Sequence, residues 1–169
     1  MTFEEYPLHD SQRGWFGRAL YFEMQKNPNI FLLTADLGFG MFDHHQRDFP
    51  DRFINTGAAE CAMIGAAIGL ALSGKIPFCY SITPFLLYRP FEWIRNYIHH
   101  EGIPVRLAGS GLDKDYEHDG ITHQSFDARS ALRMFPSIVP YFPECKELVP
   151  DYVHHMIESN TPSFLCLRR

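Results

Sequence analysis

The sequence predicts an α/β domain with three layers, in which a mainly parallel sheet of about six strands is flanked by helices. Short apolar runs of strand length alternate with helical patterns along the whole chain, which is the order expected of a parallel sheet with crossover helices. The 169 residues are 46% hydrophobic and 21% charged. This composition is typical of a single folded domain and excludes a disordered chain.

The helices are predicted from their start and stop signals. The first covers residues 11–26, with Asp10 as its N-cap and Asn27-Pro28 as its stop. Glycine closes the next two, at Gly74 and Gly102, as is usual just beyond a helix end. The five predicted helices are 11–26, 58–73, 90–100, 124–134 and 146–158.

The strands are predicted from short apolar runs between these helices. They cover residues 30–35, 52–55, 76–81, 105–109, 137–141 and 163–167. Because ligands of open parallel sheets bind in the loops beyond the carboxyl ends of the strands, we expect functional residues to follow these runs.

Composition and charge exclude several classes of protein. The chain has a net charge of −5, with 15 scattered basic residues, whereas general nucleic-acid binders need clustered Lys and Arg. It has no apolar run near the roughly 18 residues of a membrane span and no signal-peptide pattern. The four cysteines lack metal or redox spacing, and the three His-His pairs lack further ligands, so no metal site is predicted. We expect a cytoplasmic protein with reduced, mostly buried thiols.

The segment from Gly57 to Gly74 is the most informative part of the chain. Cys61, Gly65 and Gly69 recur at four-residue steps and would form a face of very small side chains on a helix. Either the domain's own sheet or a second subunit could approach this face. Glu60 falls in the first turn of the same helix. It would stabilise the helix dipole there, or act as a poorly solvated carboxylate that shares a proton.

Five separated motifs, in the right order, resemble the pyrimidine-binding domain of transketolases, which are thiamine-diphosphate enzymes. The motifs are Thr34-Ala-Asp36-Leu, Arg52-Phe-Ile-Asn-Thr-Gly57-x-x-Glu60 with Gly74-Lys-Ile-Pro-Phe, Phe91-Glu-Trp-Ile-Arg95, Asp119-Gly-Ile-Thr-His123-Gln, and Leu132-Arg-Met-Phe-Pro136. The similarity runs over nearly the whole chain. It implies the thiamine-diphosphate-binding fold for a single domain, residues 1–169.

The resemblance assigns cofactor roles to four residues. Glu60 would hydrogen-bond the aminopyrimidine and favour the tautomer that removes a proton from the thiazolium carbon. Phe85, with Ile82 as second candidate, would pack against the pyrimidine ring, although Phe85 as a plain core residue is an equal alternative. Asp36 would lie near the thiazolium, or would simply be a turn residue.

The resemblance also assigns substrate roles. His123 would act as a second catalytic residue and contact the donor's hydroxyl and carbonyl groups, and Asp119 would contact sugar hydroxyls. Arg13 and Arg168 match phosphate-clamping arginines. The serine and histidine that usually assist them are missing, because Gly40 and Ser110-Gly111 stand near those positions.

The resemblance implies an incomplete active site. The chain lacks the family's diphosphate-binding and C-terminal domains, so we expect a partner subunit that holds Mg²⁺ and the diphosphate, in an α₂β₂ assembly. The implied reaction transfers a two-carbon ketol unit between sugars or sugar phosphates. The alternatives are a subunit of a thiamine-dependent 2-oxo-acid decarboxylase or acyl transferase, and a non-catalytic regulatory subunit that kept the fold.

Overall fold

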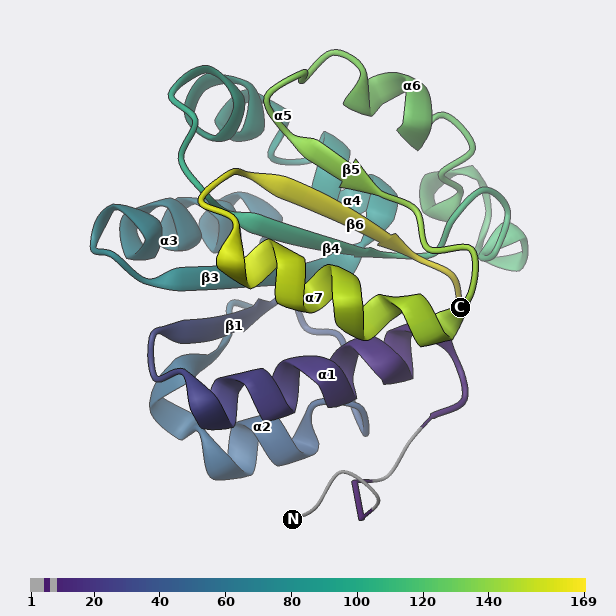
Figure 1. The fold of residues 1–169 in the computed structure, drawn as a ribbon. Coiled ribbons are helices and arrows are strands. Elements are labelled where there is room, and N and C mark those ends of the chain that lie inside the picture. Colours follow the sequence, from purple (N-terminus) through teal and green to yellow (C-terminus); the bar gives the residue numbers. More distant parts are fainter. Residues whose placement is uncertain (1–4, 7–8) are drawn as a thin grey trace.

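The computed structural model describes residues 5–6 and 9–169, and these form a three-layer α/β domain (Figure 1). All strand pairs are parallel, and the spatial order is β2-β1-β3-β4-β6-β5. The strands are β1 (Ile30–Thr34), β2 (Phe53–Asn55), β3 (Ile76–Ile82), β4 (Arg106–Ser110), β5 (Val139–Tyr141) and β6 (Ser163–Leu167). The predicted fold class and all six predicted strands are confirmed, and no strand end shifts by more than two residues.

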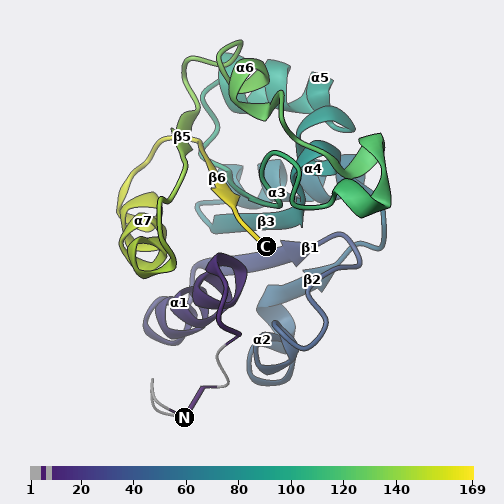
Figure 2. The same cartoon turned by 90° about the vertical axis from the view of Figure 1, so that its right-hand side faces the viewer.

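Two groups of helices cover the sheet. One face carries α1 (Gln12–Lys26) and α7 (Val149–Glu158), and the other carries α3 (Glu60–Leu72), α4 (Thr83–Tyr88), α5 (Phe91–Trp93) and α6 (Ala128–Leu132) (Figures 1 and 2). The short helix α2 (Asp43–Asp48) lies beside the β2 edge (Figure 2). The remaining turns are η1 (Pro50–Arg52), the π-helical η2 (Ile94–His100), η3 (Glu117–Asp119), η4 (Ile121–His123) and η5 (Lys146–Leu148).

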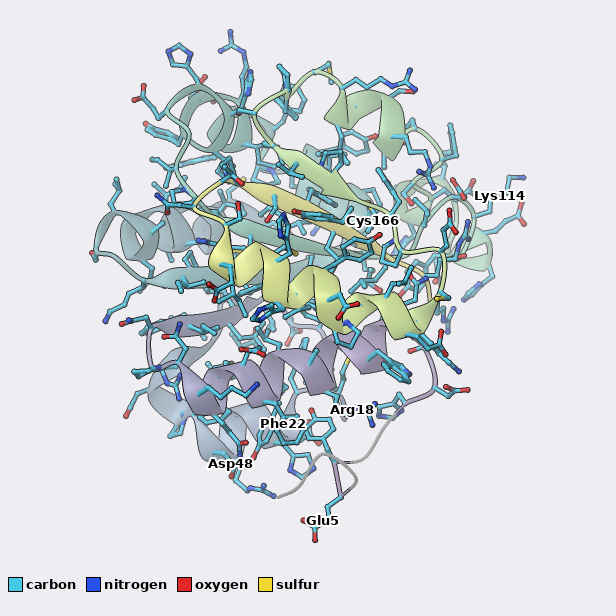
Figure 3. All side chains as sticks on the ribbon, viewed as in Figure 1. Glu5, Arg18, Phe22, Asp48, Lys114 and Cys166 are labelled. Carbon is cyan, nitrogen blue, oxygen red and sulfur yellow. The ribbon has the colours of Figure 1, made fainter. Side chains whose placement is uncertain are left out.

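Each face of the sheet has its own apolar core. Leu33, Cys79, Leu107 and Cys166 pack under α3, η2 and α6, whereas Leu32, Phe78, Ala108 and Leu165 pack under α1 and α7. Side chains alternate along a strand, so neighbouring residues enter opposite cores. Figure 3 shows Cys166 within the sheet, whereas Lys114 projects outward. Among the described residues, no helix has the length and apolar character needed to cross a membrane.

Several predicted boundaries were wrong for local reasons. Ser11 caps α1 in place of Asp10, because its Oγ accepts a hydrogen bond from the Gly14 amide at 3.2 Å, while Asp10 pairs with Lys146. The predicted helix 124–134 forms only α6, since Gln124 is extended, with ψ 146°. The sequence prediction also missed α2 and α4.

Two of the four cysteines depart from the prediction of mostly buried thiols. Cys79 and Cys166 are buried, but Cys61 and Cys145 are exposed, and all four are free. Burial raises the pKa of the Cys79 and Cys166 thiols well above the usual range. These two sulfur atoms therefore act as apolar core groups.

Candidate active site

Two groups of side chains gather near the carboxyl-end edge of the sheet. Figure 2 looks onto this edge of the sheet. The first group, which we call the Glu60 cluster, consists of Glu60, Ser81, Phe85, Arg89 and His123. The second, the Arg13 pocket, is a cavity of about 310 Å³ that Arg13, Tyr80, Ile82, Ser110 and Tyr116 line together with residues of the loops 9–14 and 37–41.

Glu60 is the first residue of α3, and only 2% of it is exposed. The left-handed backbone at Gly57, with φ +69°, turns the chain from β2 into this helix. Ala59 at the N-cap has no side chain that could satisfy the first amides, so the Glu60 carboxylate lies at a positive helix end. The helix therefore begins two residues later than predicted and places the carboxylate at its very start.

Two donors satisfy the buried carboxylate. Ser81 Oγ, on β3, donates to Oε1 at 2.9 Å, and Arg89 Nη1, just beyond α4, donates to Oε2 at 2.8 Å. A buried charge without partners costs several kcal/mol (about 3–5 when a partner is removed), so these two contacts compensate for the burial of the carboxylate. Sequence reasoning missed both donors. Ser81 closes a predicted strand and could have been found by the strand-end rule, but no local signal marked Arg89.

Arg89 connects this carboxylate to Phe85 and, beyond it, to His123. The Arg89 guanidinium lies over the Phe85 ring, 3.7 Å from its centre, and the His123 ring meets Phe85 edge-on, with centroids 4.8 Å apart. Phe85 is half-buried, so it is not simply a core residue. His123 Nδ1 lies 3.0 Å from Thr122 Oγ1. Glu60, Phe85 and His123 are thus linked by a chain of contacts in which the Arg89 guanidinium joins the carboxylate to the Phe85 ring.

Asp36 and Asp119 lie outside these contacts. Asp36 lies two residues beyond the end of β1 and has a left-handed backbone, with φ +56°. Its amide donates to Asn55 Oδ1 at 2.9 Å, which ties the segment after β1 to the end of β2. The exposed Asp119 on η3 pairs with His118, 3.2 Å away. In the part of the chain that the structure describes, neither carboxylate forms a hydrogen bond or ion pair with the Glu60 cluster.

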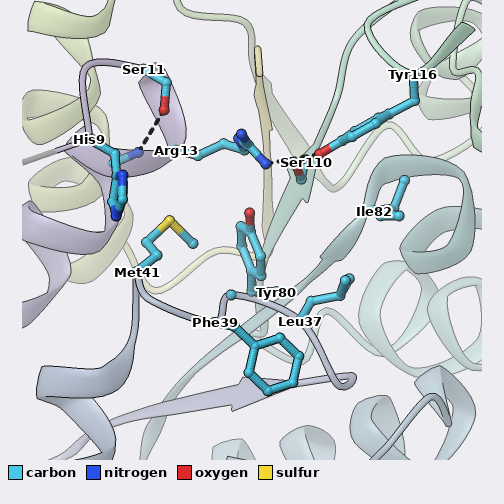
Figure 4. A pocket seen from close by; sticks show the side chains of 12 residues that line it. His9, Ser11, Arg13, Leu37, Phe39, Met41, Tyr80, Ile82, Ser110 and Tyr116 are labelled. Carbon is cyan, nitrogen blue, oxygen red and sulfur yellow. Dashed lines mark hydrogen bonds between the residues drawn. The ribbon is translucent and has the colours of Figure 1, made fainter. Parts of the chain in front are cut away.

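The Arg13 pocket is built around one guanidinium (Figure 4). Arg13 Nη1 donates to the Tyr116 hydroxyl at 3.0 Å, and that hydroxyl lies 2.7 Å from Ser110 Oγ. Tyr80 is buried and reaches the same groups, and burial raises its pKa to about 12. Ile82 lines the pocket from the end of β3. Arg13 Nε is buried with no hydrogen-bond partner among the described residues.

Arg168 does not join Arg13 in this pocket. Its guanidinium pairs with the carboxylates of Asp113, at 2.8 Å, and Asp115, at 3.2 Å. Nearly half of the Arg168 side chain is exposed. The two arginines that the resemblance assigns to a phosphate therefore do not converge in this structure.

The described residues contain no metal-binding group of three or more His, Cys, Asp or Glu side chains. The glycines of α3 do not serve the domain's own packing. A side chain at Gly65 would make only ordinary contact with Trp93, at 3.7 Å, and one at Gly69 would meet open space. This stripe of small residues is thus available on the surface of the chain.

Comparisons with known proteins agree with these observations. A protein of Methanocaldococcus jannaschii named as a transketolase C-terminal section is 32% identical over 148 residues, which are 87% of this chain and 45% of that protein. The 6-deoxy-6-sulfo-D-fructose transketolase subunit of Clostridium sp. (strain MSTE9) is 36% identical over 120 residues, 70% of this chain and 37% of that protein. The chain spans less than half the length of both relatives.

Among solved structures, a split-gene transketolase in an inactive beta4 tetramer superposes with a TM-score of 0.83 and 31% identity, over 94% of this chain and 51% of that one. The transketolase of Campylobacter jejuni has a TM-score of 0.84 at 20% identity, over 99% of this chain and 28% of that one, which shows the fold alone. The family model of the transketolase pyrimidine-binding domain matches residues 11–169. The chain therefore belongs to the transketolase pyrimidine-binding domain family.

Proposed function

We propose that this chain supplies the pyrimidine-binding half of a transketolase-like enzyme that depends on thiamine diphosphate. The observation that carries the proposal is the buried Glu60 carboxylate at the start of α3, beside the half-buried ring of Phe85. A carboxylate acceptor next to an aromatic face fits a planar aminopyrimidine. Membership of the family supports the same cofactor.

Each residue of the Glu60 cluster has a role in this proposal. When bound, thiamine diphosphate supplies a nucleophilic carbon that adds to the substrate carbonyl and carries a two-carbon unit. Glu60 accepts a hydrogen bond from the pyrimidine and can exchange a proton with it, while Ser81 keeps Oε1 oriented. Phe85 packs against the pyrimidine ring, and His123 beside it donates to, or accepts from, substrate oxygens. Ile82 and Asp36 border the cofactor from the ends of β3 and β1.

The Arg13 pocket would hold the far end of the substrate. Its guanidinium and hydroxyl groups suit a sugar with an anionic end group. Relatives are named for 6-deoxy-6-sulfo-D-fructose and for apulose 4-phosphate, both of which carry such a group. Asp119 would contact sugar hydroxyls, and Arg168 would add a second cation only after leaving Asp113 and Asp115.

The proposal requires a partner that binds the diphosphate and Mg²⁺, most simply in an α₂β₂ assembly. It is supported by relatives that are named as sections or subunits of transketolases. The similar split-gene chain was solved as a beta4 tetramer described as inactive. The exposed small-residue stripe on α3 is a surface that a second backbone could approach closely.

The test is to assay the chain with its diphosphate-binding partner, thiamine diphosphate, Mg²⁺, a ketose donor and an aldose acceptor. Glu60→Gln keeps the size and one acceptor oxygen but cannot share a proton, so we expect kcat to fall by about 10²–10⁴-fold. Glu92→Gln, at an exposed glutamate of α5, is the matched control. Equal turnover by wild type and Glu60→Gln would reject the catalytic role.

A further inference from the structure

Arg89 takes up both contacts that the Glu60 cluster offers to a planar ring. Its guanidinium carbon lies 3.7 Å from the centre of the Phe85 ring, and its Nη1 donates to Glu60 Oε2 at 2.8 Å. One planar group thus covers the aromatic face and the outer carboxylate oxygen at the same time. The inner oxygen is bonded by Ser81 and is not involved.

A guanidinium and an aminopyrimidine have the same recognition features. Both are flat, both present N–H donors in the plane, and both stack on aromatic faces. We propose that Arg89 is a displaceable placeholder: it occupies the pyrimidine site of the empty chain and swings out when the cofactor's pyrimidine binds. This inference rests on the proposed function, since it concerns the same site.

The geometry explains why the placeholder is needed. The Glu60 side chain is 2% exposed, and its carboxylate would be left with a single donor if Arg89 were absent. An incompletely paired buried charge is costly. Arg89 therefore stabilises the folded site as long as no other donor is bound to Glu60 Oε2.

The geometry also explains why the placeholder can leave. Arg89 is the C-cap residue of α4, and its side chain is 45% exposed. Its own backbone is held independently, because the carbonyl accepts a contact from Cys61 Sγ at 3.4 Å and Pro90 follows. The guanidinium is already partly solvated, so its rotation into water adds little desolvation cost for Arg89 itself. The side chain can thus rotate into solvent without disturbing the core.

The consequence is a competition between Arg89 and the cofactor. Since only the open state can bind the pyrimidine, the apparent affinity falls in proportion to the open fraction. Removal of the guanidinium should therefore have two opposite effects: a less stable empty chain and tighter cofactor binding. A residue that contacts the cofactor would lose affinity instead.

The experiment compares wild type with Arg89→Met, which keeps the length of the side chain but removes the charge and the flat donor group. Urea unfolding is measured on the chain alone, and the Kd of thiamine diphosphate by calorimetry on the complex with the diphosphate-binding partner in Mg²⁺. We expect a lower unfolding midpoint and a Kd that is smaller by about threefold or more. Arg95→Met is the control, because Arg95 hydrogen-bonds only its neighbour Asn96 within the described residues, and both quantities should stay at the wild-type value.

Arg89→Lys guards against a folding defect, since it retains a cation near Glu60 but cannot stack flat. We expect wild-type stability and an intermediate Kd. A larger Kd in Arg89→Met, or an unchanged Kd, would overturn the placeholder. Glu60→Gln separates this result from the proposed function: if that variant has normal turnover, the function fails, and if it is inactive while Arg89→Met binds no tighter, only the placeholder fails.

Discussion

The Glu60 cluster and the Arg13 pocket satisfy their charges in different ways. The Glu60 carboxylate is buried and has two donors from its own chain, Ser81 and Arg89. The Arg13 guanidinium bonds the Tyr116 hydroxyl, but its buried Nε has no hydrogen-bond partner among the described residues. Within the described residues, each oxygen of the Glu60 carboxylate therefore has a donor, whereas the Arg13 guanidinium keeps one N–H group without an acceptor.

The framework around the two sites differs as well. Glu60 lies on the helix α3 and Ser81 on the central strand β3. Both elements pack tightly into the core, and this packing fixes the positions of the two residues. Tyr116 lies in the loop after β4. Hydrogen bonds from Arg168 and Arg169 to Asp115 connect this loop to the end of β6. Under the proposed function, the carboxylate that meets the cofactor is therefore held by α3 and β3, whereas the Tyr116 hydroxyl of the substrate pocket depends on a loop.

The largest expected effect tests the completeness of the Glu60 cluster. Ser81→Ala removes a buried donor from a charged acceptor, so we expect the free energy of unfolding to fall by about 1.5–3 kcal/mol. The affinity for thiamine diphosphate should fall too, because Glu60 loses its orientation. The measurements are urea unfolding of the chain and calorimetry of the complex.

Ser163→Ala is the matched control for this prediction. Ser163 is also a buried strand serine, on β6, but its hydroxyl has no hydrogen-bond partner among the described residues. Its removal should change stability by less than about 0.5 kcal/mol. Equal losses in the two variants would mean that the Ser81–Glu60 bond carries no special weight.

A smaller effect tests how strongly burial acts on the Tyr80 phenol of the Arg13 pocket. Burial raises the pKa of Tyr80 to about 12 from its usual 10, so the folded chain keeps this phenol neutral while the unfolded chain ionises it. The stabilising contribution is complete below pH 10 and is lost as pH rises towards 12. Between pH 9 and pH 11, Tyr80→Phe should lose about 1.4 kcal/mol less stability than wild type.

Urea unfolding at both pH values, with phenolate absorbance of the folded chains, checks this prediction. The folded variant should lack one phenol that titrates late. If wild type and Tyr80→Phe lose the same stability over this range, the phenol is not protected by burial. In that case Ser110 and Arg13, which both lower the pKa of Tyr80, would offset the effect of burial.

The sequence predicted the framework well because the framework follows from periodicity. Six apolar runs and the Gly57–Glu60 turn are local signals, and they are enough to place Glu60 at the carboxyl edge of the sheet. Arg89 could not be found in this way, because its contacts with Glu60 and Phe85 join residues from α3 and α4 through side-chain rotamers. The Arg168 contacts with Asp113 and Asp115 span more than 50 residues and are equally invisible to local patterns.

The smallest expected effect decides whether Arg168 belongs to the pocket. Its side chain is 47% exposed and is bound to two carboxylates, and exposed ion pairs contribute little. Arg168→Gln should therefore lower the free energy of unfolding by about 0.2–1 kcal/mol, and less at high salt. If its observed contacts persist in the working enzyme, the KM for a phosphorylated ketose stays at the wild-type value.

Arg13→Gln provides the contrast, because Arg13 already faces the pocket. This substitution by itself should raise the KM for the phosphorylated ketose. A rise of similar size in Arg168→Gln would mean that Arg168 leaves Asp113 and Asp115 to clamp the substrate. The variant Asp113→Asn with Asp115→Asn distinguishes the two cases further. If it lowers the KM, the two carboxylates compete with the substrate for Arg168. The difference between the two regions would then apply only before the substrate binds. If the KM is unchanged, recognition of the anionic end rests on Arg13 and its hydroxyl neighbours.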